Sequence, residues 1–83
     1  MEAYWYKVCP RCDGQGRLVI CKRSDNGALF FHCDECEAAW NTAAEIGDPD
    51  KVFMGVDIPA TRAGMDDIAR HGWTQYAKKP YHK

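Results

Sequence analysis

The sequence lacks the features that mark membrane proteins, secreted proteins and most nucleic-acid-binding domains. No apolar run approaches the roughly 20 residues that a membrane-spanning helix needs. Residues 1–7 have neither the basic start nor the apolar stretch of a signal peptide, so we expect a cytoplasmic protein with no membrane association. The net charge is −1, without the basic surplus that phosphate binding normally requires.

Arrangements typical of enzymes are also absent from the sequence. There is no Ser/His/Asp, Cys/His or paired-carboxylate motif and no glycine-rich phosphate loop. There is no internal repeat or linker, and 83 residues correspond to one domain. Disorder is excluded because 46% of the residues are hydrophobic and 12% are aromatic. We therefore expect a single domain over 1–83 that is not an enzyme and has no small-molecule substrate.

What the chain does have is two Cys-x-x-Cys pairs, Cys9/Cys12 and Cys33/Cys36, separated by 20 residues. Each pair forms a tight turn that points two sulfurs at one point, and two such turns complete the tetrahedron that Zn²⁺ prefers. A domain of this size builds a small core and often needs such a metal staple. We therefore predict one structural zinc ion in a closed shell of four thiolates, with no position for water or substrate. Four thiolates and Zn²⁺ together lower the net charge by two, to −3.

Short runs of β-branched and aromatic residues predict the strands of the domain. These runs lie at residues 4–8, 17–22 and 28–32. The dipeptide Asn26-Gly27 between the last two runs predicts a tight hairpin turn. The hairpin therefore lies between the cysteine pairs, and folding it brings both pairs to one end. Phe30 and Phe31 point to opposite faces of their strand, so we expect one in the core and one exposed.

The second half of the chain predicts less regular structure. One helical turn is expected within 41–46, and a further strand or an irregular apolar segment within 51–56. A helix is predicted over 61–72, because apolar residues recur there at the helical period. The tail 81–83 is expected to fray. The predicted fold class is a small metal-stabilised α+β domain, with a ribbon core over 4–40 and a C-terminal extension that carries the helix.

The order of turn, hairpin and turn across residues 9–36 resembles a zinc ribbon. The first pair and the glycines after it are also similar to the repeated unit of the DnaJ-type chaperone zinc domain. That family uses four such units, and this chain has one. Over most of its length the chain resembles small zinc-ribbon-like immunity proteins encoded beside bacterial toxins. The shared features are an aromatic N-terminus, Cys-Pro-x-Cys, the hairpin, Trp40 four residues after the second pair, and a helix ending in Gly72-Trp73. This resemblance implies a bacterial protein that binds and neutralises a toxin.

Carboxylates in the second half of the chain support the same interpretation on physical grounds. They are Glu45, Asp48, Asp50, Asp57, Asp66 and Asp67. Toxins that act on nucleic acid tend to have basic clefts, and complementary charge speeds and orients association. We therefore predict a protein-binding module whose partner is a basic toxin domain. A solvated acidic loop is the alternative for these residues.

A nucleic-acid-binding ribbon in transcription or translation is the alternative function. It would use the basic residues of the hairpin, Arg17, Lys22 and Arg23. An exposed phenylalanine beside them would stack on bases.

Two further residues near the cysteine pairs have alternative interpretations. Cys21 is expected to be a small buried residue of a strand, and a redox-sensing thiol or an alternate metal ligand is the other possibility. His32 is expected to be a strand residue near the metal site, with replacement of a thiolate ligand as the alternative.

Overall fold

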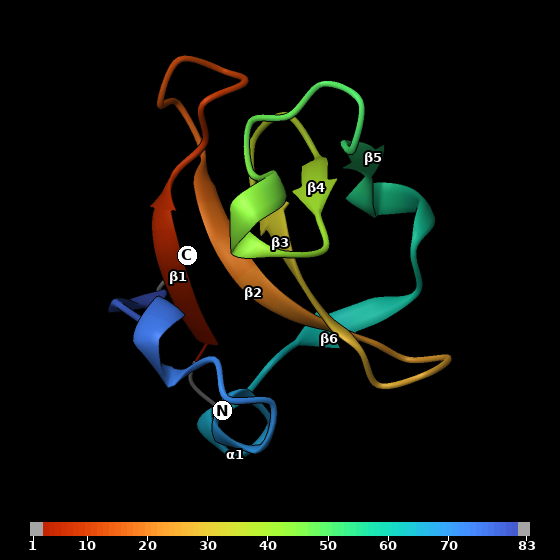
Figure 1. Ribbon diagram of the computed structural model, residues 1–83, viewed down its shortest axis with the longest axis vertical. Helices are drawn as coiled ribbons and strands as arrows, with labels where there is room; N and C mark the ends of the chain where they lie inside the picture. Colours follow the sequence, from red (N-terminus) through yellow and green to blue (C-terminus); the bar gives the residue numbers. More distant parts are fainter. Residues whose placement is uncertain (1–2, 82–83) are drawn as a thin grey trace.

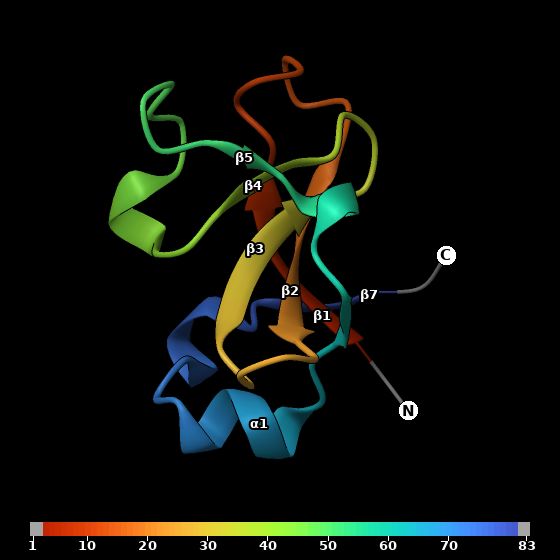
Figure 2. The same cartoon turned by 90° about the vertical axis from the view of Figure 1, so that its right-hand side faces the viewer.

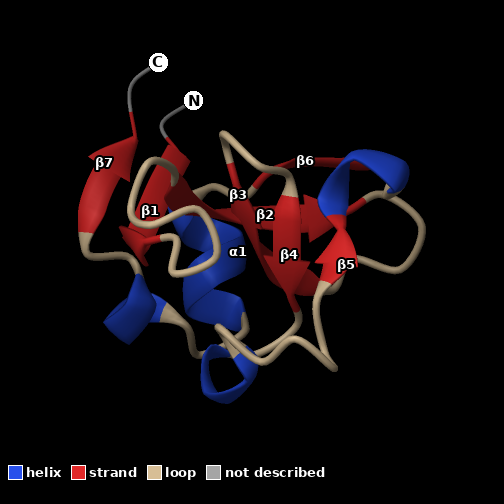
Figure 3. Cartoon of the chain, turned by 90° about the horizontal axis from the view of Figure 1, so that it is seen from above, coloured by secondary structure: helices blue, strands red, loops and turns tan. Residues whose placement is uncertain are grey.

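The computed structural model describes residues 3–81, and an antiparallel sheet of seven strands forms its framework (Figure 1). The strands are β1 (Ala3–Val8), β2 (Arg17–Arg23), β3 (Leu29–Cys33), β4 (Ala38–Trp40), β5 (Phe53–Met54), β6 (Ala60–Arg62) and β7 (Lys79–Tyr81). They lie in the order β5-β4-β3-β2-β1-β7, and β6 pairs with the C-terminal half of β2. Seen from above, β7 and β1 lie side by side at one edge of the sheet and β5 lies toward the other (Figure 3).

Hairpin β2–β3 is the centre of the sheet, as its sequence predicts. The three predicted strands at 4–8, 17–22 and 28–32 are confirmed to within one residue at each end. The turn between β2 and β3 closes with the Gly27 amide donating to the Arg23 carbonyl at 3.0 Å. The resulting register places Val19 opposite His32 and Cys21 opposite Phe30.

Both faces of the hairpin are buried. Leu18, Ile20 and Phe31 belong to the core on one face, while Val19 and Phe30 belong to a second cluster on the other. The expectation that one of the two phenylalanines is exposed is therefore wrong, since Phe30 is 1% and Phe31 0% exposed. Burial on both sides explains why β2 has a continuous apolar run instead of the alternation of a half-exposed strand.

The single α-helix of the described residues, α1 (Met65–Arg70), covers the first of these faces. It is shorter than the helix predicted over 61–72, because residues 60–62 form β6 and pair with β2. The chain leaves α1 through Gly72, whose φ of +72° suits the left-handed position that ends a helix. The next residue, Trp73, donates its amide to the Ile68 carbonyl at 2.8 Å and stacks on Phe31 with ring centroids 4.6 Å apart.

Three 3₁₀ turns complete the described chain: η1 (Ala43–Glu45), η2 (Gly55–Asp57) and η3 (Thr74–Tyr76). The turn η1 matches the helical turn predicted within 41–46, and the segment predicted over 51–56 divides into β5 and the start of η2. Figure 2 shows α1 at the opposite end of the molecule from the loop of residues 9–16. Over residues 3–81, no helix has the length and apolar character to cross a membrane.

The C-terminal segment is part of the sheet and not a frayed tail. Strand β7 pairs with β1, with Tyr81 opposite Ala3, and Tyr81 is only 5% exposed. The prediction of fraying is therefore wrong for Tyr81, while His82 and Lys83 lie outside the described residues. The residues after 40 thus supply β5, β6 and β7 to the same sheet as the predicted ribbon core.

Candidate metal centre

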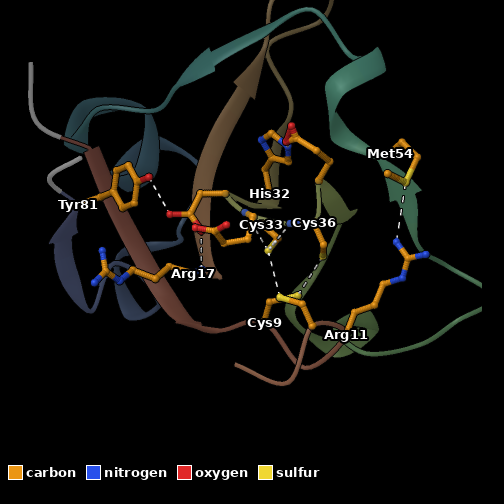
Figure 4. A network of polar contacts seen from close by, with 12 residues as sticks. Cys9, Arg11, Arg17, His32, Cys33, Cys36, Met54 and Tyr81 are labelled. Atoms are coloured by element: carbon orange, nitrogen blue, oxygen red, sulfur yellow. Dashed lines mark hydrogen bonds and ion pairs between the residues drawn. The ribbon is translucent and has the colours of Figure 1, made fainter. Parts of the chain in front are cut away.

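Four cysteine sulfurs converge at one end of the β2–β3 hairpin. Cys9 follows β1, Cys33 ends β3, and Cys12 and Cys36 close the two turns that follow them. Their Sγ atoms all lie within 4.8 Å of one another, and they are the cysteines that the sequence predicts as metal ligands. Figure 4 shows Cys9, Cys33 and Cys36 pointing toward a common centre. Two pairs of cysteines that are far apart in the chain could therefore hold one metal ion together.

The sulfur separations fit a tetrahedral thiolate site. Cys9 and Cys36 have their Sγ atoms 3.8 Å apart, and those of Cys12 and Cys33 are 3.7 Å apart. A regular tetrahedron with metal–sulfur bonds of about 2.3 Å has sulfur–sulfur edges of about 3.8 Å. A disulfide requires about 2.05 Å, so these pairs are not bonded to each other. The donor set and its spacing therefore match one ion that prefers four sulfur ligands.

The two cysteine turns share a backbone shape. In the second turn, the amides of Glu35 and Cys36 both donate to Cys33 Sγ at 3.4 Å. The residue immediately after each pair, Asp13 in the first turn and Glu37 in the second, has a positive φ, of 56° and 66°. Such amide–sulfur hydrogen bonds favour the thiolate form, which is the form that binds metal. Both turns are thus shaped to present thiolates to one point.

Gly16 lets the first turn approach the sulfurs closely. Its carbonyl accepts a hydrogen bond of 2.8 Å from the Cys9 amide, which closes the turn. A Cβ atom at this position would lie only 2.3 Å from Cys33 Sγ. Glycine is therefore required here by the space next to a sulfur.

Burial and hydrogen bonding shift the pKa values of the thiols in opposite directions. Burial raises the pKa of Cys9 and of Cys33 above the ordinary thiol value, and both are fully buried. Burial also acts to raise the pKa of Cys12, but hydrogen bonds from the Gly16 backbone and from the other thiols outweigh it and lower that pKa. A cation at the centre would replace these protons and supply the charge that the buried sulfurs need.

Asp34, in the second cysteine turn, connects this turn to strands β2 and β7. Its Oδ1 accepts a hydrogen bond from the Arg17 amide at 2.8 Å, and its Oδ2 accepts one from the Tyr81 hydroxyl at 2.8 Å (Figure 4). Burial and the nearby Asp34 carboxylate both raise the pKa of Tyr81. The last strand is thereby tied to the cysteine turn by a hydrogen bond between residues 47 positions apart.

His32 lies beside the cysteine cluster but is not one of its members. The group that could hold a metal contains only the four cysteines among the described residues. The Nε2 atom of His32 lies 2.7 Å from Glu37 Oε1, and a Cβ at Gly55 would come within 2.3 Å of the imidazole ring. The ring therefore packs over the backbone of Gly55 and beside Glu37, and it is not part of the sulfur cluster.

A groove of about 610 Å³ opens on the sheet face that α1 leaves uncovered. Cys21, His32, Glu37 and Arg62 are among its lining residues, a combination that the sequence did not suggest. Burial raises the pKa of Cys21 to about 12, so its thiol stays protonated at neutral pH and is not an activated nucleophile. Cys21 and His32 lie on the same face of the sheet, because Val19 pairs with His32 and Cys21 is two residues beyond Val19. Predicting this from the sequence would have required the register of the hairpin.

The carboxylates predicted to bind a partner do not form one surface. Residues 41–52, which we call the acidic loop, carry Glu45, Asp48 and Asp50 between β4 and β5. Asp57 lies in η2, and the remaining two, Asp66 and Asp67, lie on α1 at the other end of the molecule. Asp67 also forms ion pairs, with Lys22 at 3.2 Å and with Arg70 at 3.3 Å. Within residues 3–81, no ion pair involves the three carboxylates of the acidic loop.

The basic residues that nucleic-acid binding would use already interact with other side chains of the protein. Lys22 pairs with Asp67, and Arg23 holds Asp25 through an ion pair of 2.7 Å. The Arg17 guanidinium lies over the Trp5 ring, 5.3 Å from its centroid. Phosphate groups would have to compete with two carboxylates and one aromatic ring for these cations.

Comparisons of the chain with protein-family models, with curated proteins and with solved structures found no match. The likeness to zinc ribbons and to immunity proteins therefore rests on the sequence layout alone. The structure itself supports a small antiparallel domain with one short helix and a four-cysteine cluster that could bind a metal.

Proposed function

We propose that the protein is a zinc-stabilised, zinc-ribbon-type module that binds another protein, with the metal acting as scaffold. The four-sulfur cluster carries this proposal. Thiolates select zinc or iron–sulfur centres, and a single tetrahedral site of this size suits Zn²⁺. Four protein ligands fill its coordination shell, which leaves no position for substrate. The binding function must then lie on the surfaces that the metal holds in place.

Metal content and chelation test the scaffold role. Native mass spectrometry of the purified protein should show one zinc per chain, and Cys33→Ser should weaken zinc binding. Chelator should remove most of the circular dichroism signal of the sheet, because thiolate–zinc binding supplies folding free energy in domains of this kind. A chain that keeps its full spectrum and cooperative melting after zinc removal would contradict the scaffold role.

The acidic loop supports a basic protein as the partner. Its three carboxylates are free of ion pairs within residues 3–81, whereas two of the three cations of the hairpin are paired. Complementary charge gives a basic partner faster association and a preferred orientation. The sequence resemblance to immunity proteins adds the kind of partner, a toxin domain whose basic cleft the protein would occlude. The more specific proposal is that the protein is an immunity protein.

Charge reversal on the loop tests the partner surface. With zinc-loaded protein and a partner recovered from the native cell, the double variant D48K/D50K should bind at least tenfold more weakly. The variant D66K changes one acidic residue on α1, and it should bind as the wild type does. Unchanged binding by D48K/D50K would refute the loop as the contact surface. Salt-dependent binding of the wild type to RNA or DNA, with no protein partner, would instead favour the nucleic-acid-binding ribbon.

A further inference from the structure

The groove on the sheet face opposite α1 has the size of a small-molecule site. Its volume is about 610 Å³, and pockets that hold small molecules occupy about 300–1,000 Å³. A second pocket lies beside the acidic loop and measures only about 230 Å³. Its lining residues are Pro10, Arg11, Trp40, Gly47, Pro49 and Val52. The groove is therefore the hollow whose size suits a whole ligand.

The lining of the groove is mostly apolar. Cys21 and Phe30 pair across hairpin β2–β3, and both line the groove although they are only 6% and 1% exposed. The chain that connects β5 to β6 forms a wall, to which Val56, Ile58 and Ala60 contribute. In Figure 1 this turquoise segment runs along one side of the sheet. Val56 is 65% exposed, so the wall offers a ligand apolar surface that is otherwise in contact with water.

Arg62 is the charged lining residue that has no carboxylate partner. Its guanidinium lies over the Tyr81 ring, 4.9 Å from the centroid, and it forms no ion pair within residues 3–81. The carboxylate of the groove, Glu37, has its Oε1 2.7 Å from His32 Nε2. An adjoining hollow adds Asp34, which already accepts hydrogen bonds from a backbone amide and from the Tyr81 hydroxyl. The charge that remains available in the groove is therefore positive.

The sheet face around Arg62 carries two further cations. Lys79 and Tyr81 are alternate residues of β7 and point to the same face, on which Arg62 covers the Tyr81 ring. Lys79 Nζ and the Arg17 guanidinium each lie 5.3 Å from the centroid of the Trp5 ring. Neither cation takes part in an ion pair among the described residues. A guanidinium stacked on a ring keeps its in-plane N–H groups free, and these fit a carboxylate with two parallel hydrogen bonds.

We propose that the groove binds a small organic acid, a carboxylate with an apolar body. The carboxylate pairs with Arg62, and the apolar body packs on Cys21, Phe30 and Ile58. A cationic ligand would be repelled by Arg62 and the cations near it, and a purely polar anion would leave the apolar lining unused. This site involves neither the acidic loop nor the four thiolates, so it is independent of the protein-binding function proposed above.

Titration with three simple probes tests the groove directly. Zinc-loaded, ¹⁵N-labelled protein is titrated with 3-phenylpropionate, with its neutral amide and with acetate, which has the carboxylate without the apolar body. Saturable shifts are expected for 3-phenylpropionate at the amides of Cys21, Ile58 and Arg62. The neutral amide and acetate should each bind at least tenfold more weakly. Equal binding of the acid and its amide, equal binding of acetate, or shifts that map elsewhere would overturn the proposal.

Charge removal at Arg62 supplies the variant, and Arg70 supplies its matched control. Arg62→Gln should abolish the preference for the acid over its amide, and Arg62 is exposed, so the fold should tolerate the change. Arg70→Gln removes the same charge from α1, across the sheet, and should leave the preference unchanged. A preference that survives in Arg62→Gln overturns the site.

The apolar C-terminal residue of a protein has the same chemistry as a small organic acid. Acetyl-Gly-Phe with a free C-terminus, and the same peptide with an amidated C-terminus, therefore complete the titration. Weaker binding of the free-ended peptide than of 3-phenylpropionate supports a small acid as the ligand. Tighter binding of that peptide, lost on amidation, would overturn the small acid and assign the groove to a protein C-terminus.

Discussion

Gly16→Ala adds one methyl group next to a metal-binding sulfur. The new Cβ would lie 2.3 Å from Cys33 Sγ, so one of the two atoms must move by more than an ångström. Cys33 is fully buried, and ligand positions in a metal site tolerate about 0.2 Å. Overpacking of this kind costs about 1–3 kcal/mol, which corresponds to zinc affinity roughly 5- to 150-fold below that of the wild type. Gly16 does not have a positive φ, so backbone strain adds nothing to this effect.

Gly72→Ala is the matched control for this prediction. Its φ of +72° makes alanine strained, and a Cβ there meets nothing within 4 Å. This variant should lose about 1–2 kcal/mol of stability through the backbone alone. Because zinc binding and folding are coupled, both variants should bind zinc more weakly. Only Gly16→Ala should alter the tetrahedral Co²⁺–thiolate absorption spectrum of the cobalt-substituted protein. A wild-type spectrum and affinity in Gly16→Ala would refute the steric argument.

Three further changes test the core and the C-terminal strand. Tyr81→Phe removes the hydrogen bond to Asp34 and should lower the free energy of unfolding of the zinc-loaded protein by about 1–3 kcal/mol in urea, whereas an unchanged midpoint would argue against the bond. Trp73→Ala removes the ring stacked on Phe31 and should cost about 3 kcal/mol in the same assay; a loss well below 1 kcal/mol would contradict the stacking. The pKa of Cys21 is raised from 9.0 to about 12 in the folded protein, so the stability due to its neutral thiol is full below pH 9.0 and declines as the pH rises toward 12. Between those pH values, Cys21→Ala should therefore lose less thermal stability than the wild type, and parallel melting curves would contradict this.

The cysteine cluster and the hairpin were predictable because local sequence encodes both. A Cys-x-x-Cys turn needs only four consecutive residues, and Asn26-Gly27 specifies the reversal that brings the two turns together. The helical period after Thr61 also identified Ile68, which is fully buried. The same period placed Met65 on the buried face, yet Met65 is the first residue of the six-residue helix and is 39% exposed.

The short outer strands were not predictable, because long-range pairing forms them. Strand β7 has three residues and pairs with β1, almost the whole chain away. Strand β6 also has three residues, and it replaced the start of the predicted helix because the edge of β2 beyond β1 was open to it. Three residues are too few to show an alternating pattern, so no local signal distinguishes such strands from loops.

The order of acidic residues along the chain gave a misleading view of the surface. Asp48 and Asp66 belong to one acidic stretch in the sequence, but the fold places them at opposite ends of the molecule. Asp67 is further removed from any partner surface because Lys22 and Arg70 already neutralise it. The pocket beside the acidic loop had no signal in the sequence, since its walls come from two segments that are about 30 or more residues apart in the chain.

The cysteine cluster and the pocket beside the acidic loop share a wall, although none of the four cysteines lines the pocket. Pro10 lies between Cys9 and Cys12, so a metal bound by these sulfurs would also fix one side of the pocket. The other side depends on Trp40, four residues beyond Cys36, and on its hydrogen bond to the Asp48 carbonyl. Loss of a bound metal should therefore displace the Pro10 wall of the pocket as well as the cysteine turn. A closed four-thiolate site can in this way set the shape of a neighbouring surface while its own coordination shell stays filled.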